Sequence, residues 1–198
     1  TSCDDADAGY YVDSTASSTQ TACAAGTYQP DTGQTSCLDT DAGYYVDIAG
    51  SDAQYACQLG TYQALTGQSL CDEADAGYYV DSTASTTQTV CSTGTYQPDT
   101  GQTSCLYADA GHYVDSIGSD FQTECSKGSY QPYTGQTSCD DADAGYYVDT
   151  TASATQTACA VGTFQEYTGQ TSCDVADAGH YVDSTASDTQ TECPAGTY

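Results

Sequence analysis

Residues 23–37 read CAAGTYQPDTGQTSC, and residues 91–105 read CSTGTYQPDTGQTSC. The twelve cysteines of this 198-residue chain stand at positions 3, 23, 37, 57, 71, 91, 105, 125, 139, 159, 173 and 193, so the gaps between them alternate between 20 and 14. The sequence therefore has a 34-residue period, present almost six times without an insertion or a deletion. A fixed period of this length is the signature of a repeat array.

The composition argues against a helical repeat, although some helical repeats share this period. The chain has 19 glycines, and each repeat is crowded with Ser, Thr and Asp, which are poor helix formers. Short extended segments between turns fit these residues better.

Charge and apolar content exclude further classes of protein. The 28 acidic residues face one basic residue, Lys127, and the formal net charge is −27. Leu, Ile, Val and Phe together make up less than a tenth of the chain, which is typical of disordered chains, and the cysteines are the reason to expect a fold. We expect no nucleic-acid partner, because one cation cannot neutralise phosphates. We expect no membrane span, because no run of about 18 apolar residues exists.

A second, 17-residue period lies inside the first. When Gly9 is aligned with Gly26, Ala6 falls on Cys23 and Gln20 falls on Cys37. The sequence therefore predicts small disulfide-rich modules, mostly β or irregular, in an elongated tandem-repeat rod with a 34-residue period (2 × 17). The segments expected from the longer period are 1–22 (a partial repeat without a bridge), 23–56, 57–90, 91–124, 125–158, 159–192 and 193–198 (the start of the next repeat).

The 17-residue alignment favours one disulfide frame. If Cys23 bonds Cys37, then Ala6 and Gln20 mark the same bridge lost as a pair, and no cysteine is orphaned. The predicted bridges are Cys23–Cys37, Cys57–Cys71, Cys91–Cys105, Cys125–Cys139 and Cys159–Cys173. Cys3 and Cys193 would then pair beyond this chain, which we expect to be an excerpt of a longer protein or a mature fragment. The alternative frame, Cys3–Cys23 and onward, closes all twelve cysteines and stays open at this point.

The pattern Cys-x-x-Gly-Thr-Tyr-Gln-Pro-x-Thr-Gly-Gln-Thr-Ser-Cys resembles the ephrin-receptor-like cysteine-rich repeat, which is related in style to EGF-like and tumour-necrosis-factor-receptor modules. The segment from Cys3 to Gly9 resembles the Cys-x-x-Cys junction of that family, with Ala6 in place of the second cysteine. The resemblance implies small, extracellular, disulfide-bridged β modules in a row. This chain departs from the family in lacking half of the cysteine set.

Two aromatic positions recur. Position 11 is Tyr in all six repeats, and position 28 is Tyr except for Phe164. We interpret both rings as the small core of each module, lying over the disulfide or the next ring. Carbohydrate stacking is the functional alternative.

Recurring aspartates suggest a calcium site, because oxygen-rich loops with a glycine at a sharp turn suit Ca²⁺. The alternative is that Asp caps turns and keeps the surface charged. We expect no required cofactor, with Ca²⁺ as a candidate ligand. The candidate ligands are Asp7, Asp13, Asp41, Asp47, Asp75, Asp81, Asp109, Asp115, Asp143, Asp149, Asp177 and Asp183.

Clustered hydroxyl residues are candidates for O-glycosylation, by analogy with Ser/Thr-rich stalks. The chain has no Asn, which excludes N-glycosylation. The candidate positions are Ser14, Thr15, Ser17, Ser18, Thr19, Ser82, Thr83, Ser85, Thr86 and Thr87.

The sequence predicts a structural protein. Catalytic sites are singular, whereas the carboxylates of this chain are copied in every repeat, so we expect no enzyme. We expect a structural segment of an extracellular fibre, stalk or cell-surface filament, whose partners are copies of itself or adjacent repeats and attached O-glycans. The alternative is a multivalent adhesin or receptor ectodomain that binds glycans or proteins.

Overall fold

The computed structural model describes residues 3–197, in which the regular elements are short β-strands joined by turns and bends, without any helix. Thr1, Ser2 and Tyr198, the outermost residues of the first and last predicted segments, lie outside the described residues. The chain divides into two compact units, residues 3–90 with 97–105 and residues 91–96 with 106–197. The division into 34-residue segments stays a prediction.

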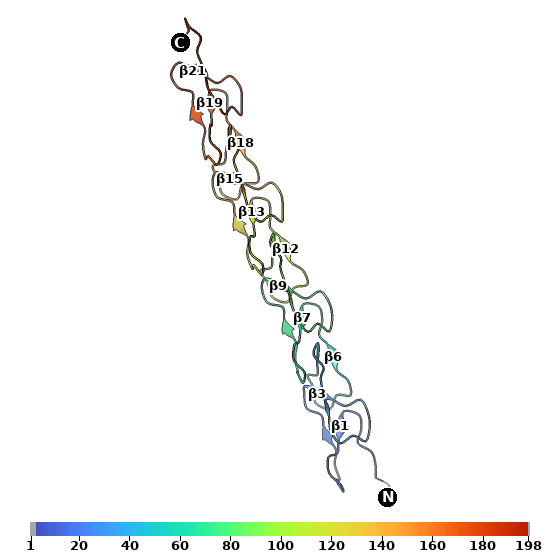
Figure 1. Ribbon diagram of the computed structural model, residues 1–198. Helices are drawn as coiled ribbons and strands as arrows, with labels where there is room; N and C mark the ends of the chain where they lie inside the picture. Colours follow the sequence, from blue (N-terminus) through green and yellow to red (C-terminus); the bar gives the residue numbers. More distant parts are fainter. Residues whose placement is uncertain (1–2, 198) are drawn as a thin grey trace. The chain divides into compact units, whose positions relative to one another are not determined.

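Every strand is two residues long and pairs with one antiparallel neighbour. The hairpins of the N-terminal unit are β1 (Tyr10–Tyr11) with β2 (Thr21–Ala22), β3 (Thr27–Tyr28) with β4 (Leu38–Asp39), β5 (Tyr44–Tyr45) with β6 (Tyr55–Ala56), β7 (Thr61–Tyr62) with β8 (Asp72–Glu73), and β9 (Tyr78–Tyr79) with β10 (Thr89–Val90). Within this unit the hairpins follow one another in chain order (Figure 1, blue to green).

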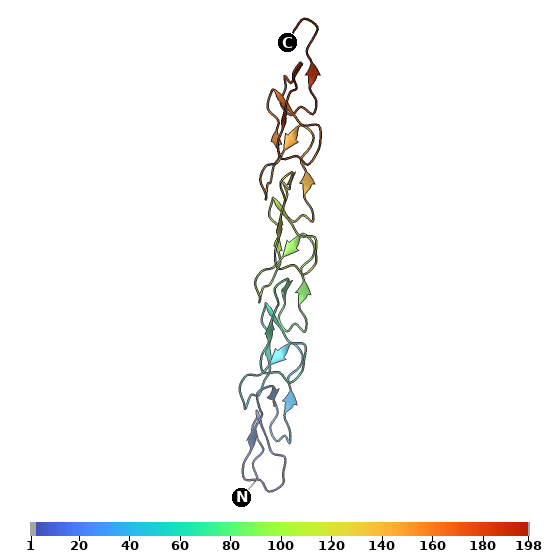
Figure 2. The same ribbon diagram turned by 90° about the vertical axis from the view of Figure 1, so that its left-hand side faces the viewer.

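The C-terminal unit is built in the same way (Figure 2). Its hairpins are β11 (Thr95–Tyr96) with β12 (Leu106–Tyr107), β13 (His112–Tyr113) with β14 (Thr123–Glu124), β15 (Ser129–Tyr130) with β16 (Asp140–Asp141), β17 (Tyr146–Tyr147) with β18 (Thr157–Ala158), β19 (Thr163–Phe164) with β20 (Asp174–Val175), and β21 (His180–Tyr181) with β22 (Thr191–Glu192). One hairpin therefore occurs in each 17-residue unit, so the hairpins follow the shorter sequence period.

A tight turn precedes the first strand of each hairpin. The N–H of Tyr10 donates to the carbonyl oxygen of Asp7 at 3.0 Å, and Gly9 has a φ of +83°. A four-residue turn with positive φ at its third position is of type II and favours glycine there. This requirement explains why a glycine returns at this position in every 17-residue unit.

The disulfides follow the 14-residue frame. Cys23 and Cys37 are bonded, with their Cα atoms 5.7 Å apart. Cys57–Cys71, Cys125–Cys139 and Cys159–Cys173 repeat this bridge, and Cys91 and Cys105 are also disulfide-bonded. Cys3 and Cys193 are free, so the alternative frame is not the one formed, and their pairing beyond this chain stays a prediction.

These bridges define two kinds of 17-residue unit. We call the units that begin at Cys23 and its equivalents bridged halves. The units that begin at Ala6 and its equivalents have no disulfide, and we call them open halves.

Both kinds of half make the same backbone hydrogen bonds to their neighbours. In an open half, the Gly9 N–H donates to the Gln29 carbonyl oxygen at 2.7 Å, and in a bridged half the Gly26 N–H donates to the Val46 carbonyl oxygen at 2.8 Å. Two further bonds recur 17 residues along the chain. The Val12 N–H donates to the Gln34 carbonyl oxygen, as the Gln29 N–H does to that of Ser51. The Gly33 N–H donates to the Ala6 carbonyl oxygen, as the Gly50 N–H does to that of Cys23. The backbone network therefore does not distinguish the two kinds of half.

Two side-chain positions in each half form the core, next to the turn glycine, which is buried in most halves. The first alternates between a small residue and a half-cystine, and its buried members are Ala6, Cys23, Thr40, Cys57, Ala74, Cys91, Ala108, Cys125, Ala142 and Cys159. The second alternates between Gln and Val, and its buried members are Gln29, Val46, Gln63, Val80, Gln97, Val114, Gln131, Val148, Gln165 and Val182. A chain with few large apolar residues can fold in this way because each half buries little more than these side chains and the turn glycine.

The tyrosines do not fill this core. Tyr11 and Tyr28 are half-buried, whereas Val46 and Cys23 are fully buried. The interpretation of both rings as the core of each module is therefore wrong. Small side chains and half-cystines occupy the interior, and the rings are covered only in part.

Candidate functional site

A side-chain pair closes each open half where the disulfide is missing. The backbone N–H of Asp7 donates to Oε1 of Gln20 at 2.8 Å, and Nε2 of Gln20 donates to Oδ2 of Asp7 at 2.7 Å. We call this two-bond pair the amide clamp. It returns as Asp41–Gln54, Asp75–Gln88, Asp109–Gln122, Asp143–Gln156 and Asp177–Gln190.

The clamp stands almost at the position of the bridge. Gln20 aligns with Cys37, while its partner Asp7 follows Ala6, which aligns with Cys23. A glutamine suits this place because its amide offers both an acceptor and donors, and so pairs with an N–H and a carboxylate together. The recurrence of Gln20 in every repeat already indicates a side-chain amide bonded to turn backbone, and the Asp7 N–H bond confirms this. The second bond, to the Asp7 carboxylate, is not predicted from the sequence.

The two closures differ in strength and in chemistry. A disulfide that closes a loop of about 15 residues contributes about 3 kcal/mol on the chain-entropy model. Each hydrogen bond of the exposed clamp contributes about 0.5–1.5 kcal/mol, because water competes for the same groups. A clamp opens by thermal motion or force alone, whereas a bridge opens only by reduction or covalent rupture.

A buried glutamine stiffens each bridged loop. Nε2 of Gln29 donates to the Ser36 carbonyl oxygen at 2.8 Å, and Oε1 of Gln29 accepts the Asp31 N–H at 3.1 Å. Gln29 is only 4% exposed, so these bonds compensate the loss of water at its amide. Its equivalents in the later bridged halves are buried in the same way.

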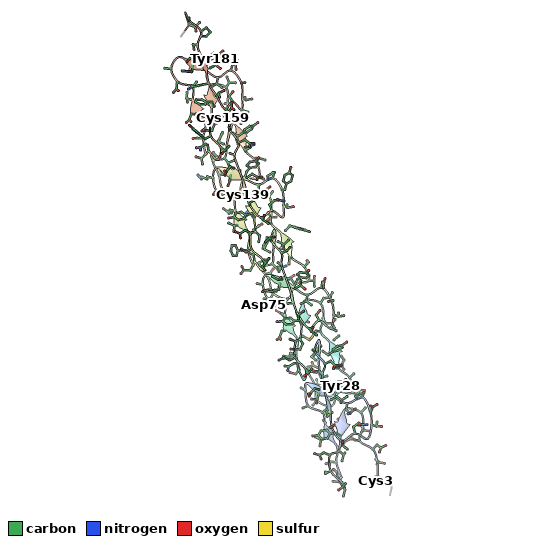
Figure 3. All side chains as sticks on the ribbon, in the orientation of Figure 1. Cys3, Tyr28, Asp75, Cys139, Cys159 and Tyr181 are labelled. Carbon is green, nitrogen blue, oxygen red and sulfur yellow. A yellow bond between two sulfur atoms is a disulfide. The ribbon has the colours of Figure 1, made fainter. Side chains whose placement is uncertain are left out.

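The predicted calcium ligands are exposed and do not gather. The carboxylate of Asp7 is held by Gln20, and Figure 3 labels its equivalent Asp75. Asp13 and its equivalents lie on the surface. Among the described residues, no three His, Cys, Asp or Glu side chains are placed to hold one metal ion. A site at Asp7 would have to compete with the clamp. Calcium binding stays a prediction, and an unchanged melting temperature with and without a chelator would reject it.

The candidate O-glycosylation positions lie in the loops between the strands of the open-half hairpins. The residues from Ser14 to Thr19 are all exposed. In the equivalent loop, Ser85 is partly covered and its hydroxyl donates to the Ser82 carbonyl oxygen at 2.9 Å. Attachment of sugars stays a prediction.

Three tyrosines of the bridged halves have perturbed ionisation. Burial raises the pKa of Tyr62, and the carboxylates of Asp75 and Asp72 raise it further. Burial and Asp109 likewise raise the pKa of Tyr96. The pKa of Tyr130 is also raised, by burial first and then by nearby carboxylates. The cause is that a phenolate at this position would lie partly out of water and beside fixed negative charge.

Comparison with known proteins gives no family. No protein-family model matches the chain, and no curated protein matches it. The resemblance to ephrin-receptor-like repeats therefore stays a prediction. No helix within residues 3–197 is long and apolar enough to cross a bilayer.

Proposed function

We propose that this chain is a structural segment of an extracellular fibre, stalk or cell-surface filament built from tandem disulfide-bridged repeats. One observation supports this above the others: the backbone bonds of Gly9 to Gln29 and of Gly26 to Val46 recur at constant offset in successive halves. A chain in which every unit docks on the next by the same bonds gains length without a new interface. The expectation that it is not an enzyme stays a prediction.

The disulfides support the extracellular location. Bridges of this kind form and persist in oxidising compartments, and they stabilise domains with little apolar core. We propose that the partners are copies of the chain or adjacent repeats, with O-glycans on the exposed hydroxyl loops. Measurement of the intact mass tests the glycans, since a mass equal to the 20.5 kDa polypeptide would reject them.

Electron microscopy of the native assembly tests the fibre. We expect long threads of uniform diameter with no ligand added. Isolated globular particles, or a sheath in which these repeats decorate another polymer, would contradict the proposal. Reduction of the same sample provides the control, because threads held by intrachain bridges should lose their regular diameter.

Exposed aromatic residues favour a second candidate, a multivalent adhesin or receptor ectodomain. Tyr107 is 71% exposed, Tyr133 is 69% exposed and Tyr167 is 63% exposed. Such rings suit stacking on sugars or contact with a protein. Glycan-array binding by the isolated chain, lost on Tyr133→Ala and retained on Thr134→Ala, would support this candidate. Absence of binding would reject its glycan form.

A further inference from the structure

The two kinds of half offer different resistance to a force along the chain. In a bridged half, tension that enters at Cys57 leaves at Cys71 through a covalent bond, and the loop between them carries none. In the following open half no disulfide joins Ala74 and Gln88, so tension between them is resisted by hydrogen bonds alone: those of the hairpin, the amide clamp and the backbone bonds to neighbouring halves. Every 34-residue repeat therefore contains one half that force alone can open and one that it cannot.

The comparison between halves is matched because their backbone bonds are the same. The Gly43 N–H of an open half donates to the Gln63 carbonyl oxygen at 2.7 Å, and the Gly60 N–H of a bridged half donates to the Val80 carbonyl oxygen at 2.8 Å. Both glycines lie in the same compact unit and in the same type of turn. A difference in stability between the two kinds of half can therefore be assigned to the disulfide or the clamp, since their backbone hydrogen bonds are equivalent.

We propose that the amide clamp is a releasable closure, so that open halves yield under tension and re-form while bridged halves stay shut. This inference rests on the proposed structural function. The clamp suits release because it is exposed to water and its partners are adjacent in space without a covalent bond. The bridges then set a limit, since the loops behind them stay out of the extended path.

The limit has a defined size. The Cα atoms of Cys57 and Cys71 lie 5.8 Å apart across a sequence separation of 14. The same segment fully extended would span about 45–50 Å, so each bridge withholds about 40 Å of length. An open half has no such restriction and releases its loop entirely.

Single-molecule stretching of the full oxidised chain between end handles tests the proposal. We expect reversible extension that stops short of the full contour, and a further gain of about 40 Å per bridge after a reductant is added. The decisive variant is Ala74→Cys with Gln88→Cys, which places two cysteines where the bridged halves carry theirs. A mass two hydrogens lower than that of the reduced variant confirms that the new disulfide has formed. The oxidised variant should then extend about 40 Å less than the oxidised unmodified chain.

A second variant tests the clamp itself. Gln88→Ala should lower the force of one opening event, and Gln58→Ala is the matched control. Gln58 is an exposed glutamine in the bridged half whose amide bonds only the nearby Ala56 carbonyl group. The proposal would be overturned if the Ala74→Cys, Gln88→Cys variant extended as far as the unmodified chain. Equal opening forces for Gln88→Ala and the unmodified chain would overturn it as well.

Hydrogen exchange on the unmodified chain gives a test without any substitution. The Gly43 amide should exchange faster than the Gly60 amide, because local opening of its half is not restrained by a bridge. Equal or reversed rates would contradict the clamp as the weaker closure. These results separate the two proposals. If the clamp behaves as expected but electron microscopy shows no threads, the fibre alone is rejected. If threads form but the Gly43 and Gly60 amides exchange at equal rates and Gln88→Ala opens at the same force as the unmodified chain, the clamp alone is rejected.

Discussion

Gly43 lies directly against the carbonyl group of Ala84, two halves further along the chain, with no room between them for a side chain. The same backbone approach joins Gly9 to Gly50 and Gly26 to Gly67. This close approach brings three successive halves into contact. The turn therefore requires glycine for two reasons: its φ is positive, and a Cβ atom would collide with the neighbouring carbonyl group.

Gly43→Ala should therefore destabilise the fold by about 2–4 kcal/mol, from left-handed backbone strain together with the collision at Ala84. Chemical denaturation of the oxidised chain measures the loss. Gly67→Ala is the control, because Gly67 also has positive φ but a Cβ atom there meets only the Asp39 side chain at ordinary contact distance. Equal losses for both variants would show that the close approach is unimportant.

Ala84→Gly should stabilise the fold by about 0.5–1 kcal/mol. Ala84 has a φ of +56°, a region where alanine is strained and glycine is not. Gly50 and Gly118 already occupy the equivalent position in other repeats. The melting temperature should rise, whereas Ala76→Gly, in the turn before Gly77, should lower it. A fall in both variants would contradict the strain at Ala84.

A bridged half should be convertible into an open half. Replacing Cys57 by Ala, Gln58 by Asp and Cys71 by Gln reproduces the residues that form the clamp at Asp75 and Gln88. The triple variant should lose about 1 kcal/mol less than Cys57→Ala with Cys71→Ala, because the new clamp replaces part of the closure. Denaturant midpoints of the two variants measure the difference, and identical midpoints would show that no clamp forms.

Alkaline pH should weaken the fold. The pKa of Tyr62 is raised in the folded chain, so the unfolded chain loses the phenol proton at lower pH. The stabilisation is complete below the unfolded pKa of about 10 and is lost as pH rises through the folded value. Denaturation between pH 9 and 11 should show this fall.

Tyr62→Phe provides the control for the alkaline effect. Phe164 occupies the equivalent position naturally, so a ring without a hydroxyl fits there. The variant should lose less stability than the unmodified chain over the same pH range. An unchanged slope would place the alkaline effect at other tyrosines.

The repeat and the bridge frame could be derived from sequence because both depend on spacing. Ala6 and Gln20 mark a bridge missing as a pair, and the structure forms Cys23–Cys37 at the same spacing. The elongated shape, the ligands and the location depend on more than spacing and stay predictions.

The core and the clamp could not be derived because both depend on side-chain direction. Gln29 is a polar residue, yet it is buried, and its amide donates one hydrogen bond and accepts another. Tyr28 is a large ring that sequence reasoning places in the core, yet it is only half-buried. The partner of Gln20 is Asp7, one residue away from the position that aligns with Cys23, so alignment of the halves alone does not find it.

The bridges also decide what a single proteolytic cut can do. A cut between two half-cystines that are bonded to each other leaves the fragments covalently joined. A cut in an open half breaks the only covalent connection between the two parts of the chain. Lys127, the one basic residue, lies between Cys125 and Cys139. A protease that cleaves after basic residues therefore finds its single target inside a loop where cleavage does not sever the chain.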